Sequence, residues 1–309
     1  MAPNQLSSGD VLADRRADYA RMMAEGGDFT GAAELIEQAL ELAPGWAAGW
    51  FRLGEYREKA GLPDQAADAY ARTASLDPEG VFGAPLKLAL LGRAGVPDHP
   101  PSRYVEQLFD DYAARFDKAL VERLGYSVPQ KLKALVDTQG RHFATAIDLG
   151  CGTGLFGVEI RSGVNWLEGY DLSRNMLREA EAKAVYDHLG QADLSLDAEA
   201  SGLFSDDRGL FRADLVSAAD VLMYLGDLGQ PFRLARDLLA PAGLFAFSVE
   251  DAGDGDGFRL VQSMRYAHTE AYVRTTLAAH GFSLTHLERT VIRMDAGAPV
   301  HGILFLAAA

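Results

Sequence analysis

The 309-residue sequence is poor in several residue types, and each shortage excludes a class of protein. Its single cysteine, Cys151, can form no disulfide within the chain, which excludes the disulfide framework of many secreted proteins. No apolar run approaches the roughly 20 residues of a membrane-spanning helix. The polar N-terminus lacks the apolar core of a signal peptide. We therefore expect a cytoplasmic protein with no membrane partner.

Basic residues are also scarce, because Lys+Arg number 29 against 44 Asp+Glu, a net charge of -15. A surface this acidic repels phosphate backbones, so we expect no nucleic-acid partner. Hydrophobic residues make up 48% and charged residues 24% of the chain, which is typical of a globular protein. The length is sufficient for about two domains.

The first hundred residues contain an internal repeat. Residues matched at a spacing of 34 are Gly27, Gly61 and Gly95, Ala32 and Ala66, Ala33 and Ala67, Leu42 and Leu76, and Pro44 and Pro78. The pattern predicts helix pairs in which a small residue, Ala66, lies where two helices cross and Pro78 ends the second helix. Two repeats fit, at about 13–46 and 47–80, and a further helix is predicted near 85–91.

This repeat resembles the tetratricopeptide repeat. The resemblance implies an all-α domain over residues 1–100 that binds a peptide or protein partner in its concave face. Arrays of this kind usually need about three repeats to be stable alone. We therefore expect the array to be supported by its neighbouring domain or by a second copy of the chain, as a homo-oligomer.

A proline cluster, Pro97-Asp-His-Pro-Pro101, predicts the boundary between two domains. Beyond it, short apolar strands alternate with helical segments, a pattern that predicts a parallel sheet. The second domain is therefore expected to be an α/β domain over residues 101–309.

A glycine-rich loop follows the first predicted strand, which ends at Leu149. Gly150, Gly152 and Gly154 lack side chains, so a ligand can approach the backbone closely. Two interpretations compete for this loop. The segment 152–157 fits G-x-G-x-x-G, the dinucleotide fingerprint. The wider segment Ile147-Asp-Leu-Gly-Cys-Gly-Thr-Gly154 resembles motif I of the class I S-adenosylmethionine-dependent methyltransferases.

Position favours the methyltransferase interpretation. Gly150 is the first glycine after the strand, and G-x-G-x-x-G does not fit from it. Asp148 would repel a pyrophosphate, whereas it suits the ammonium group of S-adenosylmethionine. The resemblance implies a doubly wound, Rossmann-like sheet that binds this cofactor, and its product S-adenosylhomocysteine, at the strand tips.

The resemblance also implies roles for individual residues. Asp171, 17 residues beyond Gly154, would accept the ribose hydroxyls. The other implied cofactor contacts are Cys151 in the loop, Leu172, Met176 against adenine, Asp193 at the adenine amino group, and Ala219 near the methyl group. Met176 fits a core position equally well.

An aromatic helix precedes the glycine loop. Phe109, Tyr112 and Phe116 have the i, i+3 and i+4 spacing of one helix face. Such a stripe is commonly core, but in small-molecule methyltransferases an equivalent helix closes over the cofactor. Tyr112 and Phe116 are therefore candidates for a lid.

Methyl transfer mainly requires positioning of donor and acceptor, and a base is needed only for a protonated acceptor. Tyr224 and His268 are the candidates to orient or deprotonate the acceptor, the alternatives being a packed aromatic and a capping or surface group. Residues 219–228 lack Asn/Asp-Pro-Pro-Tyr, which argues against methylation of adenine or glutamine amino groups. The Gly/Asp loop at 251–257 lacks the closing Glu of a calcium hand, so no metal is expected.

The chain as a whole resembles bacterial proteins that join tetratricopeptide repeats to a class I methyltransferase domain. This implies methyl transfer to an O or N atom of a small-molecule or carrier-bound acceptor. The alternatives are an adaptor that binds the cofactor without turnover, a protein methyltransferase whose repeats recruit the substrate, and a dehydrogenase.

Overall fold

The computed structural model describes residues 7–117, 125–205, 207–295 and 297–309. The chain divides into two compact units, Met1–Gln107 and Leu108–Ala309. Helix α7 (Ser102–Tyr112) carries the chain across this division.

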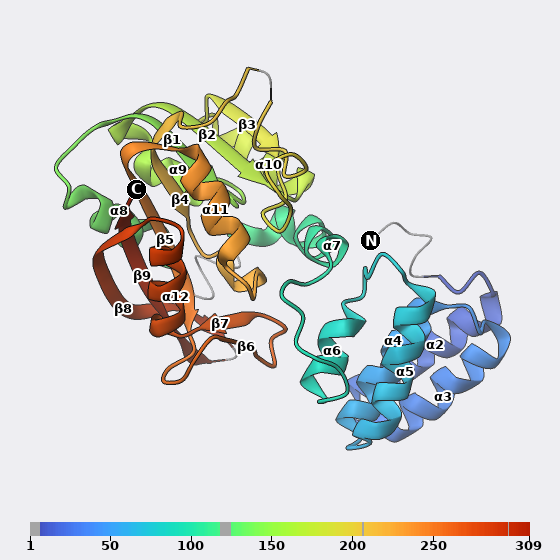
Figure 1. The fold of residues 1–309 in the computed structure, drawn as a ribbon. Coiled ribbons are helices and arrows are strands. Elements are labelled where there is room, and N and C mark those ends of the chain that lie inside the picture. The colour runs from blue at the N-terminus through green and yellow to red at the C-terminus, as the bar shows by residue number, and fades with distance from the viewer. Residues whose placement is uncertain (1–6, 118–124, 206, 296) are drawn as a thin grey trace. The chain divides into compact units, whose positions relative to one another are not determined.

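The first unit consists of helices connected by short turns (Figure 1). They are α2 (Val11–Glu25), α3 (Phe29–Leu42), α4 (Ala47–Lys59), α5 (Pro63–Leu76) and α6 (Ala84–Leu90). Each helix packs against the next one along the chain. Their shared core is rich in alanine, which permits close helix crossings.

The backbone repeats its conformation along this unit. Helices α3 and α5 both have 14 residues, and each follows a left-handed glycine, Gly27 (φ 85°) or Gly61 (φ 75°). Where α4 crosses α5, a Cβ on Gly54 would lie 2.5 Å from the Tyr70 ring. Only glycine therefore fits at this crossing.

The second unit is built on one sheet. Its described strands are β1 (Phe143–Leu149), β2 (Val164–Asp171), β3 (His188–Gln191), β4 (Ala213–Ala218), β5 (Leu239–Asp251), β6 (Phe258–Leu260), β7 (Tyr266–His268), β8 (Ser283–Asp295) and β9 (Ala298–Ala308). The order is β3-β2-β1-β4-β5-β7-β6, and the first five strands in this order are parallel. β9 pairs antiparallel with β5 and with β8.

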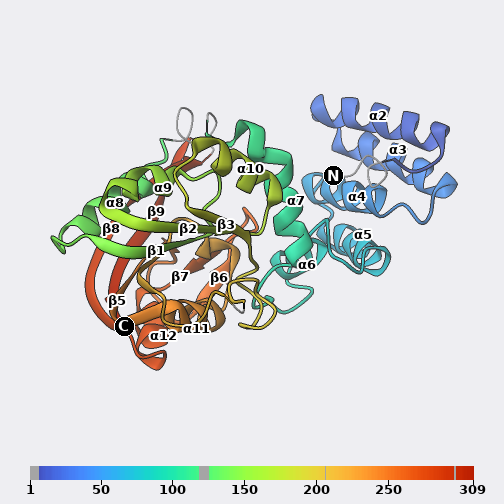
Figure 2. The ribbon, with the colours of Figure 1, turned by 90° about the horizontal axis from the view of Figure 1, so that it is seen from above.

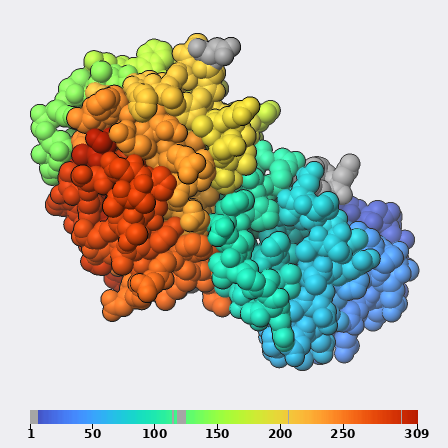
Figure 3. Space-filling model, in the orientation of Figure 1, coloured from blue at the N-terminus to red at the C-terminus, as the bar shows by residue number. Residues whose placement is uncertain are grey.

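Helices cover both faces of the sheet. Figure 2 shows α8 (Val128–Asp137), α9 (Leu155–Ile160) and α10 (Arg174–Lys183) on one side, and α11 (Gly229–Leu238) and α12 (Glu270–Ala279) on the other. Two apolar cores result, one around Leu132, Phe156 and Ile160 and one around Phe232 and Phe247. The outer side of α12 forms part of the molecular surface (Figure 3). This arrangement confirms the predicted Rossmann-like α/β fold.

Two local features differ from what the sequence indicates. β5 extends over Leu239–Asp251, beyond the apolar run at 243–249, because Leu239 pairs with β4 and Asp251 pairs with β7. His268, for which a capping role was the alternative, ends strand β7, and Thr269 caps α12. No helix in the described ranges is long and apolar enough to cross a membrane.

Candidate functional site

The glycine loop connects β1 to α9 in a conformation that needs its glycines. Gly150, Gly152 and Gly154 have φ values of 64°, 55° and 89°, all left-handed. A Cβ on Gly150 would lie 2.3 Å from the Val221 side chain, so only glycine fits at this position of the loop. Around Gly152, in contrast, no described atom lies within 4 Å of the Cβ position. The loop therefore offers an open approach to its backbone at Gly152.

Asp171 ends β2 beside this open position. Its Oδ2 accepts a hydrogen bond from the Gly152 amide at 2.9 Å, and its Oδ1 accepts one from the Ser173 amide at 2.8 Å. Desolvation raises the pKa of Asp171 to about 6. The two bonds hold the carboxylate at the carboxyl end of the parallel strands, where ligands of this sheet type bind.

Asp148 lies one layer deeper, with 1% of its surface exposed. The hydroxyls of Tyr186 and Ser217 each donate to its carboxylate at 2.8 Å. Burial raises the pKa of Asp148 to about 7. The protein itself therefore supplies two of the hydrogen bonds that this carboxylate accepts.

Tyr186 was not identified from the sequence, although it explains a glycine that was noted. A Cβ on Gly157 would lie 2.4 Å from the Tyr186 ring, and a Cβ on Gly169 would lie 2.8 Å from it. The last glycine of the apparent dinucleotide fingerprint therefore makes room for the ring whose hydroxyl reaches Asp148. No local sequence pattern marks Tyr186, because its ring meets these glycines only in the folded chain.

The other predicted cofactor residues also lie at the carboxyl end of the parallel strands. Leu172 and Asp193 follow the ends of β2 and β3, and Ala219 follows β4. The Asp193 carboxylate accepts from the amide and the hydroxyl of Ser195, at 2.9 and 2.6 Å. Met176 is fully buried on α10, a core position.

Two carboxylates, one in α7 and one just after it, form hydrogen bonds at the carboxyl end of the parallel strands. Asp117 accepts a hydrogen bond from the Thr153 hydroxyl in the glycine loop and one from Lys183 Nζ at 2.6 Å. Asp110 accepts one from the Ser173 hydroxyl, just beyond β2, at 2.5 Å. The segment is thus fixed to both the glycine loop and the end of β2, by contacts that no local sequence pattern indicates.

The aromatic residues of the same segment pack against Tyr224, which follows β4. The Phe109 ring lies 5.0 Å, edge-on, from the Tyr224 ring, and 6.2 Å from the Phe116 ring. Tyr112 contacts Phe116 at 5.7 Å. Tyr224, in η4 (Leu222–Tyr224), is 7% exposed, and burial raises the pKa of its hydroxyl. The predicted aromatic helix face and Tyr224 therefore form one cluster beside the tip of β4.

A buried group of charges lies beyond Tyr224. Arg293 of β8, 2% exposed in its side chain, donates to both Asp220 oxygens at 2.9 Å and pairs with Glu250. Asp220, next to Ala219, has a left-handed backbone (φ 56°). Arg265 Nε contacts the Tyr224 hydroxyl at 3.4 Å. Sequence reasoning missed Asp220, Glu250 and Arg293, because these residues are brought together only by the sheet.

His268, the second residue predicted to orient or deprotonate the methyl acceptor, is fully buried. Its Nε2 lies 2.9 Å from the Leu225 carbonyl oxygen and 3.0 Å from that of Gly226. Burial lowers the pKa of His268 to about 4, so the imidazole is neutral at pH 7. The structure places His268 behind the loop that follows Tyr224.

Two further observations concern the Cys151 thiol and the residue types that bind metals. Cys151 is 6% exposed, and burial raises the pKa of its thiol well above the ordinary value, so the sulfur is not a reactive thiolate. Among the described residues, no group of three or more His, Cys, Asp or Glu side chains is arranged to hold a metal ion.

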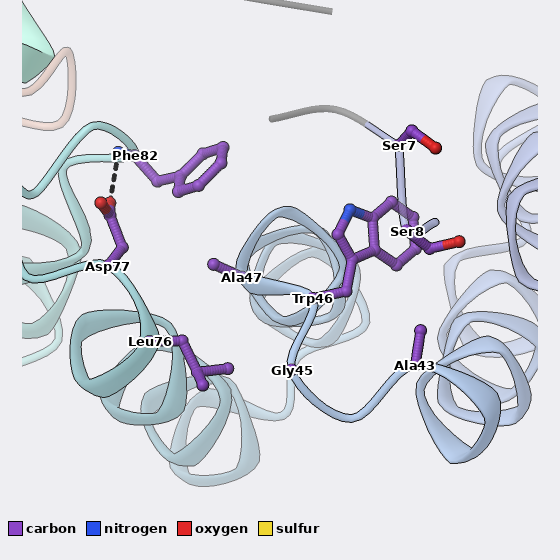
Figure 4. Close-up of a pocket in the computed structure, with 9 residues that line it drawn as sticks. All are labelled: Ser7, Ser8, Ala43, Gly45, Trp46, Ala47, Leu76, Asp77 and Phe82. Atoms are coloured by element: carbon purple, nitrogen blue, oxygen red, sulfur yellow. Dashed lines mark hydrogen bonds between the residues drawn. The ribbon is translucent and has the colours of Figure 1, made fainter. Parts of the chain in front are cut away.

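A separate hollow of about 320 Å³ lies in the first unit (Figure 4). Its lining comes from the turns before α4 and α6 and from the chain before α2, and includes Trp46, Leu76 and Phe82. Trp46 is 6% exposed, and its indole nitrogen has no hydrogen-bond partner among the residues that the structure describes. Such a donor usually costs about 1–3 kcal/mol when left unpaired.

The second unit combines a Rossmann-like sheet, a glycine loop after its first strand and a carboxylate at the tip of its second strand. These features fit a methyltransferase domain. Residues 104–290 match the family described as "Methyltransferase domain". The chain belongs to this family.

Known proteins similar to this chain include a malonyl-[acyl-carrier protein] O-methyltransferase of Geobacter sulfurreducens. It is 32% identical over 169 residues, which cover 53% of this chain and 59% of the relative. The chain thus spans less than two thirds of the length of this curated relative.

Two solved structures share the fold at 19% identity. One is the 1,6-didemethyltoxoflavin-N1-methyltransferase of Burkholderia thailandensis with S-adenosylhomocysteine (TM-score 0.52, 70% of this chain and 92% of that chain). The other is the magnesium protoporphyrin IX methyltransferase of Synechocystis PCC 6803 with S-adenosylmethionine (TM-score 0.50, 70% and 98%).

Proposed function

We propose that this protein transfers the methyl group of S-adenosylmethionine to an O or N atom of a small-molecule or carrier-bound acceptor. The observation that carries the proposal is the Asp171 carboxylate beside the open backbone at Gly152. In this assignment Asp171 accepts the ribose hydroxyls and Gly150–Gly154 border the amino-acid part of the cofactor. Asp148 balances its ammonium group, with Tyr186 and Ser217 fixing the carboxylate.

The adenine part of the cofactor is assigned to the ends of β2 and β3. Asp193 accepts from the adenine amino group, and Leu172 supplies apolar contacts, whereas the fully buried Met176 is assigned to the core. Tyr112 and Phe116 cover the cofactor from the α7 side. The hydrogen bonds of Asp110 and Asp117 support this lid role, because they fix the segment above the strand tips.

On the acceptor side, we assign Tyr224 and Ala219 to the region of the transferred methyl group. The leaving group of a sulfonium displacement is a neutral thioether, so the main task is to align the acceptor with the methyl carbon. Tyr224 can orient the acceptor through its hydroxyl. The relative from Geobacter methylates an oxygen and the Burkholderia enzyme a nitrogen, which supports either atom as the acceptor.

Ligand binding to the full-length protein tests the cofactor. We expect S-adenosylhomocysteine to bind by calorimetry, NADH not to bind, and Asp171→Ala to abolish the binding. A protein that binds NADH instead would refute the assignment in favour of a dehydrogenase. Incubation with a methyl-labelled donor and cell extract then shows which class of molecule accepts the methyl group. Label in small molecules or carrier-bound acids supports the proposal, and label in other proteins indicates a protein methyltransferase.

For residues 1–100 we propose a tetratricopeptide array joined to the methyltransferase domain at 101–309, in a cytoplasmic protein. The equal turns before α3 and α5 support this assignment. We assign the hollow beside Trp46 to a peptide or protein partner. The short array also leads us to propose self-association.

The partner and the assembly can each be tested directly. Sedimentation of the purified chain checks self-association. The indole NMR signals check the partner site when a candidate peptide is added. We expect the Trp46 signal to move and that of Trp50, whose indole already donates to the Pro44 carbonyl at 2.9 Å, to stay. Equal shifts at both positions would refute the assignment.

A further inference from the structure

The loop Tyr224–Leu228 joins η4 to α11 just after β4, and side chains from one short segment fix its conformation. That segment, Arg265–Tyr272, includes β7, the cap residue Thr269 and the first turn of α12. Three of its side chains contact three different points of the loop.

His268 holds the middle of the loop. Its Nε2 lies 2.9 Å from the Leu225 oxygen and 3.0 Å from the Gly226 oxygen. Carbonyl oxygens only accept hydrogen bonds, so Nε2 must carry the hydrogen in this arrangement. The lone pair is then on Nδ1, which is buried without a hydrogen-bond partner among the described residues. An Nε2 whose hydrogen is shared by two carbonyls cannot accept a proton from a substrate.

Tyr272 and Arg265 hold the two ends of the loop. The Tyr272 hydroxyl accepts from the Leu228 amide at 2.8 Å and donates to Asp227 at 3.2 Å. Arg265 Nε contacts the Tyr224 hydroxyl at 3.4 Å. Tyr272 also supports His268, because the two rings lie nearly parallel at 6.0 Å.

We propose that Arg265–Tyr272 is a template that sets the position of Tyr224 for the acceptor, with His268 as a positioning residue. In this assignment the imidazole acts as a neutral hydrogen-bond donor to the loop and not as a general base. The inference rests on the proposed function, which assigns Tyr224 to the acceptor. It adds the element that fixes Tyr224.

The chemistry around the imidazole agrees with this role. The titratable groups near it are Tyr272 on α12 and Asp227 in the loop, and the apolar Phe258 of β6 packs on another side. Asp227 is occupied by the Tyr272 hydroxyl and by the Gly229 amide, at 2.8 Å. Burial outweighs the nearby carboxylate, so His268 stays uncharged across the neutral range.

Histidine NMR of the full-length protein, labelled with ¹⁵N-histidine, tests the tautomer directly. We expect the His268 signals to show hydrogen on Nε2 and to remain unchanged between pH 5.5 and 8. The exposed His286 and His301 are the controls, because both side chains are open to solvent. Titration of His268 in the same range, or hydrogen on Nδ1, would overturn the proposal.

Two variants test the positioning of Tyr224. His268→Gln keeps a neutral donor near the place of Nε2, whereas His268→Phe keeps a ring without a donor. In protein labelled with fluorotyrosine, the Tyr224 signal, assigned with Tyr224→Phe, should shift in His268→Phe and return toward the wild-type position in His268→Gln. Unchanged Tyr224 signals in both variants would overturn the inference.

S-adenosylhomocysteine binding measured on the same samples keeps the two proposals separate. If the wild-type protein fails to bind it, the proposed function fails, while the tautomer and the Tyr224 signals still decide the template role. If His268→Phe does not fold, the wild-type tautomer and the His268→Gln variant decide it.

Discussion

At the scale of single residues, Asp171 is the side chain on which cofactor binding should depend most. Asp171→Asn removes the charge from the proposed ribose acceptor. Hydrogen bonds to charged groups contribute about 1.5–3 kcal/mol, so the dissociation constant of S-adenosylhomocysteine should rise roughly ten- to a hundred-fold. Calorimetry measures this change.

Asp193→Asn is the matched comparison, because an amide oxygen still accepts from an adenine amino group. Its effect on the same constant should be smaller than that of Asp171→Asn. Equal losses in the two variants would contradict the distinct roles of the two carboxylates.

Asp148 predicts a pH dependence of stability. Its pKa is about 7 in the folded protein, against an ordinary value of 3.8. Between these values the folded state binds a proton that the unfolded state has lost, so the free energy of unfolding falls as the pH rises from about 4 to 7. Asp148→Asn removes this contribution and keeps an oxygen for the Tyr186 hydroxyl.

Urea unfolding at pH 5 and pH 8 checks this sign. The loss of stability between the two pH values should be roughly 1–3 kcal/mol larger in the wild-type protein than in Asp148→Asn. A variant that loses as much as the wild type would show that Asp148 is already ionised at pH 5.

At the scale of elements, the segment following α7 is fastened to the glycine loop by Lys183. Its Nζ donates to Asp117 and to the Thr153 carbonyl, both at 2.6 Å. Lys183→Met breaks both bonds and should speed cofactor release. A partly exposed pair contributes at most about 1 kcal/mol, so we expect a two- to five-fold increase, about the limit such a pair allows.

The chain offers a matched control for this variant. Lys133 pairs with Asp137 at 2.5 Å on α8, and its side chain is 24% exposed, as is that of Lys183. Lys133→Met should leave the release rate of S-adenosylhomocysteine, measured by stopped-flow displacement, unchanged. Similar release rates in the two variants would show that the Lys183–Asp117 ion pair does not hold the lid over the cofactor.

The limits of sequence reasoning also lie at this scale. Gly150–Gly154 and Asp171 could be predicted, because the loop and the next strand tip are set by local spacing. Asp110, Tyr186 and Arg293 could not, because each acts on a residue 38 to 73 positions away. The full length of β5 was equally hidden, since its first and last residues pair with β4 and β7 outside the apolar run.

The same limit applies to His268. Its residue type and its place after β5 suggest a base, but burial decides the protonation state, and burial depends on Tyr272, Phe258 and the Leu225–Gly226 carbonyls together. Sequence spacing therefore predicted the glycine loop and the strand tips, while the burial of the polar groups became visible only in the packed structure.

At the scale of the whole molecule, the division into two compact units predicts two unfolding steps. Tryptophans report on the units separately, since Trp46 and Trp50 lie in the first and Trp166 in the second. Trp166→Phe leaves reporters only in the first unit, and the double variant Trp46→Phe/Trp50→Phe leaves one only in the second. Urea unfolding followed by fluorescence then resolves each step.

Ligand binding should act on only one of these steps. S-adenosylhomocysteine at about 100 times its dissociation constant should add about 2.7 kcal/mol to the free energy of unfolding of the unit that binds it. We expect this shift in the variant that retains Trp166 and none in the variant that retains Trp46 and Trp50. Equal shifts in both would mean that the units unfold together, because a ligand stabilises only what unfolds with its site. The helical array would then depend on the methyltransferase domain for its stability.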